Sequence, residues 1–165
     1  MPINSNAGRT LYFARQYEQA IEQLRKTLDM DPNFPLTLWY LGMAHEQVSR
    51  PDEAIAELLK ASLSRDLPTV LGGLGHAYAV SGKRAEAHQV LEELQDLSKR
   101  RYVSPFNIAL IHAGLGDKAQ AFEWLDKAYQ DHSQLLSWVN VWPQFDGLRG
   151  EPRFQDLVRR MGLKP

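Results

Sequence analysis

The sequence predicts an all-α fold in which four antiparallel helix pairs stack into one array. An alanine recurs as Ala20, Ala54, Ala87 and Ala121, in steps of 34, 33 and 34 residues. A leucine follows each of these alanines by four residues, and a glycine or alanine precedes each by twelve. Three landmarks that share one set of steps along the whole chain indicate a structural repeat.

Each repeat contains two helices joined by a short turn. The second helix of the first repeat carries Tyr17, Ala20, Ile21 and Leu24 as an apolar stripe at helical spacing. Proline ends one helix or begins the next. Prolines that separate consecutive pairs are Pro32, Pro68 and Pro105, and turns within pairs are expected at 49–52, 81–82 and 116–117.

The repeats are expected to cover residues 1–134, and the rest of the chain departs from their period. The expected units are about 1–34, 35–68, 69–101 and 102–134. The tail contains a short apolar stretch before Pro143 and a last helix that starts at Pro152. An array of repeats needs a terminal unit that covers its last apolar face. We therefore expect residues 135–165 to form C-terminal capping helices.

The pattern of small residues within each unit, with a proline near its end, resembles the tetratricopeptide repeat. The match is best over Tyr17–Pro32 and Leu38–Gly42, whereas the third and fourth units lack the final proline. The stretches Gly116–Leu125 and Phe145–Leu157 also resemble the C-terminal end of tetratricopeptide arrays in large bacterial signalling regulators. Those regulators include winged-helix activators, nucleotide cyclases and serine/threonine kinases. The resemblance implies a right-handed α-α superhelix that serves as a sensory or partner-binding appendage.

Composition and charge narrow the classes of function. The net charge of −1 provides no overall field for nucleic acid or anionic lipid, so we expect neither as a partner. The uncharged run that most resembles a membrane segment, Val70–Val80, is too short to span a bilayer. The N-terminus lacks the features of a signal peptide. We expect a cytoplasmic protein, with the extracytoplasmic side left open for a fragment of a membrane-anchored regulator.

No catalytic or metal-binding pattern stands out in the sequence. No two of the five histidines lie three or four residues apart, and there is no cysteine. The glycine-rich run that starts at Gly72 has Ala77 and Arg84 where a phosphate-binding loop requires glycine and a hydroxyl residue. His45 and His112 occupy a position that usually holds a core tyrosine. We expect a non-catalytic protein without cofactor or metal.

The resemblance also implies where a partner would bind, because the first helix of each such repeat lines the concave surface. Lysine and asparagine hold a peptide carboxylate in one subgroup of the family, but this chain has Ser5 and Arg9 at the first pair. A mixed aromatic wall suits an amphipathic helix or an extended peptide. The predicted partner-binding residues are Asn6, Arg9, Tyr12, Phe13, Trp39, Tyr40, Met43, Gln47, His76, Phe106, Asn107 and Leu110.

The function expected from these observations is a scaffold or adaptor that binds a protein or peptide, with self-association as a further option. Two alternatives stay open. The aromatic residues of the wall could pack beneath the cap instead of binding a partner. The chain could also be a ligand-sensing fragment of a transcriptional regulator or cyclase, with Trp138 and Trp142 as the walls of a pocket between repeats and cap.

Overall fold

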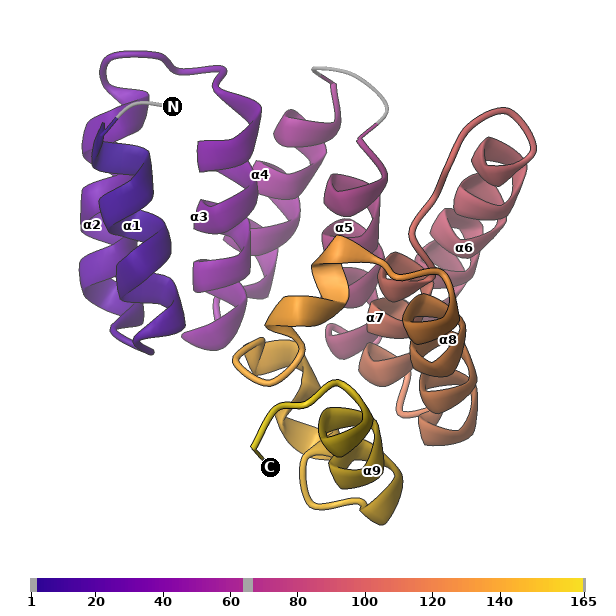
Figure 1. Cartoon of the computed structure of the whole chain (residues 1–165). Coiled ribbons are helices and arrows are strands. Elements are labelled where there is room, and N and C mark those ends of the chain that lie inside the picture. The colour runs from indigo at the N-terminus through magenta and orange to yellow at the C-terminus, as the bar shows by residue number, and fades with distance from the viewer. Residues whose placement is uncertain (1–2, 64–66, 165) are drawn as a thin grey trace.

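The computed structural model describes residues 3–63 and 67–164, which form helices and turns without a β-strand (Figure 1). The remaining parts of the predicted repeats and cap, residues 1–2, 64–66 and 165, lie outside these ranges. The helix pairs are α1 (Ile3–Phe13) with α2 (Tyr17–Leu28), α3 (Pro35–Gln47) with α4 (Pro51–Ser62), α5 (Pro68–Val80) with α6 (Arg84–Ser98), and α7 (Pro105–Gly114) with α8 (Lys118–Gln130). The predicted all-α superhelix is confirmed.

The turn inside each pair uses one conformation. Arg15, Ser49, Gly82 and Gly116 all have a positive φ, and they recur at the repeat spacing. In the first turn, the N–H of Gln16, which follows Arg15, donates to the carbonyl of Leu11, 2.9 Å away. The other three turns contain the equivalent bond. This geometry is the Schellman motif, which ends a helix with a left-handed residue. Glycine adopts that conformation without strain, so the first two turns hold a less favourable residue type than the last two.

The small residues of the repeat allow close contact between the two helices of a pair. A Cβ atom on Gly8 would lie 2.5 Å from the side chain of Leu24. A Cβ atom on Gly42 would lie 2.6 Å from Leu58 and 2.9 Å from the carbonyl oxygen of Ala54. No side chain fits at these distances without displacement of its neighbours. The sequence landmarks therefore mark the contact points of the pairs.

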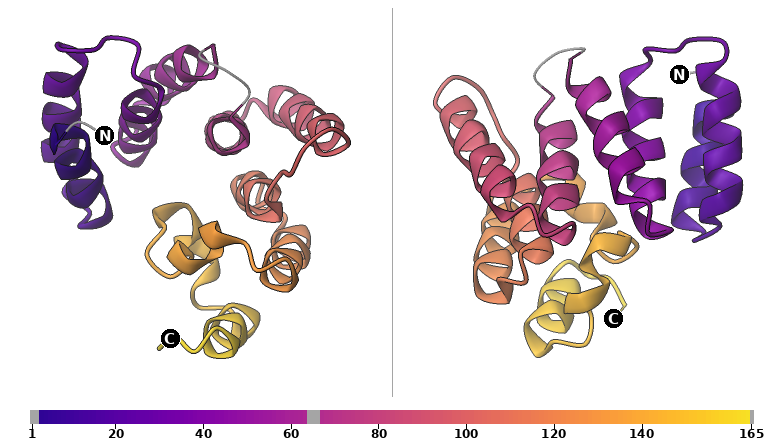
Figure 2. Two further views of the ribbon diagram at one scale, coloured as in Figure 1. Left: turned by 45° about the horizontal axis from the view of Figure 1, so that its top comes forward. Right: turned by 180° about the vertical axis from the view of Figure 1, so that it is seen from behind.

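The tail continues with two 3₁₀ helices and one α-helix: η1 (Gln134–Trp138), η2 (Pro143–Leu148) and α9 (Pro152–Arg160). Helix α9 packs on α8, where the Tyr129 hydroxyl donates to the Arg160 carbonyl, 3.2 Å away. The segment η1–η2 lies inside the curve of the array, as the left view of Figure 2 shows in orange. Its buried residues share one apolar core with the first helices of the pairs.

The position of the tail differs from that of a simple end cap. The sequence predicted a segment that covers the last apolar face, and α9 lies against that face on α8. The segment η1–η2 instead fills the concave side. The physical reason is its apolar content, since Leu136, Val139, Trp142, Phe145 and Leu148 are all buried there. Their burial stabilises the folded chain far more than exposure on a terminal helix would.

No helix in the described ranges combines the length and the apolar character that crossing a membrane requires.

Candidate partner-binding surface

The structure places most of the predicted partner-binding residues in the interior. Asn6 is exposed, and Arg9, Phe13 and Gln47 are half-buried. The other predicted residues are at most 6% exposed: Tyr12, Trp39, Tyr40, Met43, His76, Phe106, Asn107 and Leu110. The register assigned from the repeat brings residues of α1, α3 and α7 to one face. The tail then covers much of that face. This agrees with the alternative in which the aromatic residues of the wall pack beneath the cap.

Trp142, between η1 and η2, is the central contact of the tail with the concave wall. Its ring lies 5.6 Å from that of Phe13, 5.7 Å from that of Trp39 and 5.3 Å from that of Phe106, measured between centroids. Phe145 packs against Phe106 in an edge-to-face arrangement at 5.2 Å. Aromatic pairs at these separations add stabilisation beyond the burial of their area. The tail thus occupies this wall as an intramolecular ligand.

A buried polar network joins the tail to the wall. The Tyr12 hydroxyl donates to Gln144 Oε1 at 2.8 Å, and Gln144 Nε2 donates to Glu46 Oε1 at 2.9 Å. The other carboxylate oxygen of Glu46 lies 2.9 Å from His76 Nδ1. Burial and, secondly, the Glu46 carboxylate raise the pKa of Tyr12 well above its usual value, so Tyr12 remains a neutral donor. The network fixes the rotation of η2 against α1, α3 and α5.

Gln144 could not be predicted as a member of this network, because it lies outside the repeat and has no register position. An ion pair between Arg15 and Asp146 adds a second polar link, with Arg15 Nη2 donating to Asp146 Oδ1 at 2.8 Å. Burial raises the pKa of Asp146, but hydrogen bonds from Arg15 and Arg149 outweigh burial and lower the pKa below its usual value. Both partners are partly exposed, so this pair contributes at most about 1 kcal/mol.

One part of the concave wall remains open beside the tail. We call it the aromatic hollow, and its volume is about 320 Å³. Trp138 stands at its mouth with 43% of its surface exposed, and its ring stacks on that of Phe13 at 5.3 Å. The hollow is lined by Arg9, Phe13, Leu36, Trp39, Tyr40, Leu67, Thr69, Val70, Leu135, Trp138 and Trp142. Four of the predicted partner-binding residues, Arg9, Phe13, Trp39 and Tyr40, therefore line the hollow.

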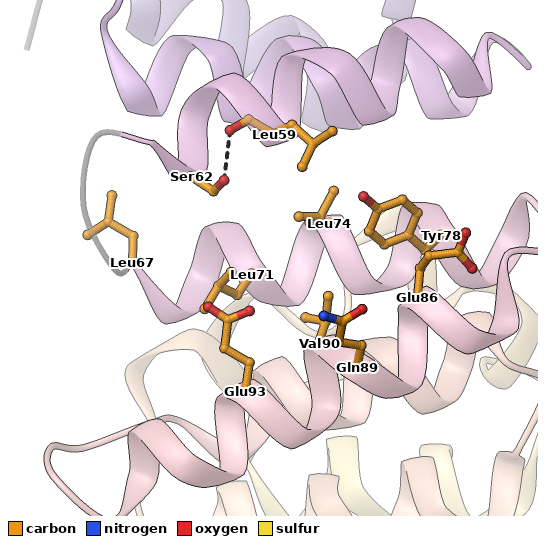
Figure 3. A pocket seen from close by; sticks show the side chains of 10 residues that line it. All are labelled: Leu59, Ser62, Leu67, Leu71, Leu74, Tyr78, Glu86, Gln89, Val90 and Glu93. Carbon is orange, nitrogen blue, oxygen red and sulfur yellow. Dashed lines mark hydrogen bonds between the residues drawn. The ribbon is translucent and has the colours of Figure 1, made fainter.

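A second depression lies between α4, α5 and α6, and the sequence had not indicated it (Figure 3). Its volume is about 250 Å³. Leu71, Leu74 and Val90 contribute apolar surface, and Glu86 and Glu93 of α6 contribute carboxylates. These two glutamates are seven residues apart and so lie on one face of the helix. The depression thus differs from the aromatic hollow, where none of the described lining residues carries a carboxylate.

His45 and His112 pack within the helix pairs, and their burial affects their protonation. The described residues hold no group of three or more His, Asp or Glu side chains arranged to bind a metal ion. His45 is 1% exposed, and burial, followed by the charge of nearby Arg25, lowers its pKa. His112 is half-buried and its pKa is also lowered by burial. Both imidazoles are therefore held in the neutral form.

The lowered pKa of His45 predicts a loss of stability in mild acid. The unfolded chain takes up a proton on His45 near the usual pKa of about 6.5, whereas the folded chain resists protonation. This contribution to the unfolding free energy is complete above that pH and declines as the pH falls toward the folded-state pKa. Between about pH 7.5 and pH 5, the unfolding free energy measured in urea should decline less steeply for His45→Gln than for the wild type. Parallel curves of unfolding free energy against pH for the two proteins would contradict a lowered pKa of His45.

Comparison with known protein families agrees with the geometry. The family model described as Tetratricopeptide repeat matches the chain twice, at residues 6–68 and 73–135. A comparison with curated proteins returns no match. The two family matches together cover most of the chain; the first spans most of α1–α4 and the second most of α5–α8. The chain therefore belongs to the tetratricopeptide repeat family.

Proposed function

We propose that the chain is a non-catalytic scaffold or adaptor module that binds a protein or peptide on its concave side. Tetratricopeptide repeats generally mediate contacts between proteins, and the two family matches are the observation that carries the proposal. The aromatic hollow supports it further. An exposed aromatic side chain beside a partly open apolar depression is typical of the anchor sites of protein interfaces.

The partner is proposed to bind with the tail in place. Burial of Leu136, Trp142, Phe145 and Leu148 stabilises the tail by about 1.5–3 kcal/mol for each side chain. Their sum, on the order of 6–12 kcal/mol, is comparable to the whole binding free energy of a micromolar complex, about 8 kcal/mol. The partner would therefore contact the predicted residues that the tail leaves accessible. These are Asn6, Arg9, Phe13 and Gln47.

The biological setting is part of the proposal. The resemblance of Gly116–Leu125 and Phe145–Leu157 to the arrays of bacterial regulators supports a role in a bacterial signalling or regulatory protein. We place that role in the cytoplasm. Self-association through the same concave side remains a prediction, for which light scattering over a range of concentrations is the measurement.

The proposal is tested by affinity capture of partners from the native host. The double variant Phe13→Leu/Trp138→Ala removes the stacked pair of the hollow and keeps an apolar side chain at the half-buried position. We expect partner recovery to fall at least about tenfold, because aromatic anchors carry much of the energy of an interface. Met30→Ala, at a 65% exposed site just after α2, is the control. Undiminished recovery by a folded double variant would contradict the concave-side proposal.

A second candidate function is a ligand-sensing fragment of a transcriptional regulator or cyclase. The observation that favours it is the position of the aromatic hollow between the repeats and the tail, with Trp138 and Trp142 as walls. Its volume of about 320 Å³ lies at the lower end of the range for small-molecule sites. Native mass spectrometry of protein purified from its own host separates the candidates. A bound protein or peptide supports the first function, and a bound small molecule supports the second.

A further inference from the structure

We propose that the aromatic hollow binds a small carboxylic acid with an apolar body, of the arylalkanoate or medium-chain alkanoate class. The proposal deepens the second candidate function and does not require a protein partner. It rests on two properties of the hollow. Its lining is mostly apolar, and among the described residues that line it the hydrogen-bonding side chains are donors, with no carboxylate beside them.

The apolar body of the ligand would lie against aromatic side chains that the array and the tail contribute together. Phe13, Trp39 and Tyr40 belong to the array, and Trp138 and Trp142 belong to the tail. Trp39 and Trp142 are each 3% exposed and are fixed by mutual contact, with their ring centroids 5.7 Å apart. A wall that is already ordered before binding loses little conformational entropy when a ligand enters. Trp138 is more exposed and lies at the mouth of the hollow.

The carboxylate of the ligand would bind at Arg9. Arg9 is the charged residue of the lining, it is half-buried, and its guanidinium carbon lies 6.0 Å from the centre of the Trp138 ring. Within residues 3–63 and 67–164, no Asp or Glu side chain forms an ion pair with Arg9. A guanidinium group binds a carboxylate through two parallel charge-assisted hydrogen bonds. The charge of Arg9 therefore selects an anion.

The remaining polar atoms of the lining favour the same ligand. The indole N–H groups of Trp39 and Trp142 are buried beneath the surface of the hollow, so the hydrogen bonds to a ligand would come from other side chains of the lining. Thr69 and Tyr40 add hydroxyl groups, and burial raises the pKa of Tyr40 to about 12, which keeps its hydroxyl protonated. Hydroxyl donors close to the cationic Arg9 favour a ligand with acceptor oxygens over a hydrocarbon.

Other occupants fit this lining less well. Aromatic walls attract quaternary ammonium ions, but the positive charge of Arg9 would repel such a ligand. A phosphate group requires several donors that converge on it, such as the N–H groups of a helix N-terminus. Among the described residues that line the hollow, Arg9 is the one cationic side chain, and most of the others are apolar. A compact monocarboxylate satisfies both features.

The experiment compares an acid with its neutral amide on the purified full chain. Tryptophan fluorescence and calorimetry are used to titrate 4-phenylbutyrate and 4-phenylbutyramide. Trp39, Trp138 and Trp142 line the hollow, so an occupant should change the emission. We expect the acid to bind at least about tenfold more tightly than the amide, which corresponds to about 1.4 kcal/mol.

Two variants assign the preference to the hollow. Arg9→Gln should reduce the affinity for the acid to that for the amide, and Trp138→Ala should weaken both ligands to a similar extent. Arg101→Gln is the matched control, because Arg101 is exposed and does not line the hollow. Equal affinities of the wild type for acid and amide, or unchanged acid binding by Arg9→Gln, would overturn the proposal.

The remaining outcomes separate this proposal from the protein-binding function. Absence of binding by 4-phenylbutyrate, octanoate and indole-3-butyrate up to about 10 mM, a concentration that detects even millimolar sites, overturns the small-acid proposal. It does so whether or not affinity capture recovers a partner. Binding of an apolar peptide at the hollow in place of the acids likewise overturns it and supports the scaffold function. Acid binding without partner recovery leaves the small-acid proposal standing and contradicts the scaffold function.

Discussion

Phe145→Ala is expected to lower the free energy of unfolding by about 3–5 kcal/mol, the usual loss when a buried phenylalanine is truncated. Phe145 is 0% exposed and lies in η2, where it packs on Phe106 of α7. The substitution removes apolar contact area and leaves a cavity between the tail and the array. Neighbouring helices cannot easily close it, because the same core holds Trp142 and Leu148 in fixed contacts.

Urea unfolding followed by circular dichroism measures this loss. Val141→Ala is the control from the same tail, since Val141 is 43% exposed and its truncation should cost well under about 1 kcal/mol. A loss below about 1 kcal/mol for Phe145→Ala would show that the tail is not part of the cooperative core. The result also decides whether the concave wall is available, because a tail that is loosely held would leave Phe106 open to a partner.

The sequence predicts the array well because the repeat specifies it more than once. Ala54, Leu58 and Gly42 recur at fixed offsets, and each landmark corresponds to a contact in the structure. The register also predicts which residues of α1, α3 and α7 share the concave face. The left-handed turn residues were less visible, since Arg15 and Ser49 stand where glycine would have marked the turn.

The path of the tail could not be predicted in the same way. Its apolar residues indicated a cap, but a segment outside the repeat has no register that places it on a particular wall. From its apolar character alone, Trp142 could pack on α8 or on the concave wall. In the folded array it packs on Trp39. The same reason hides Gln144, whose amide becomes important only when Tyr12 and Glu46 lie on either side of it.

Glu46→Ala is expected to lower the free energy of unfolding by about 3 kcal/mol, as removal of one member of a buried polar pair usually does. The Glu46 side chain is 6% exposed and accepts from Gln144 Nε2, and its other oxygen lies 2.9 Å from His76 Nδ1. Without Glu46, the amide of Gln144 and the imidazole of His76 remain buried and lose this partner. Their unmet hydrogen-bonding groups, more than the lost methylenes, account for the expected cost.

Glu46→Gln separates hydrogen bonding from packing. The amide oxygen of glutamine can still accept from Gln144, and its N–H can donate to His76 Nδ1 when the imidazole proton is on Nε2. We therefore expect Glu46→Gln to lose less than half of what Glu46→Ala loses in urea unfolding. The double variant Glu46→Ala/Gln144→Ala should lose less than the sum of the two single losses, because each single change already breaks their shared bond. Additive losses, or equal losses for Glu46→Ala and Glu46→Gln, would mean that the network does not hold η2 against α3, and that burial of Trp142 and Phe145 alone keeps the tail in the concave side.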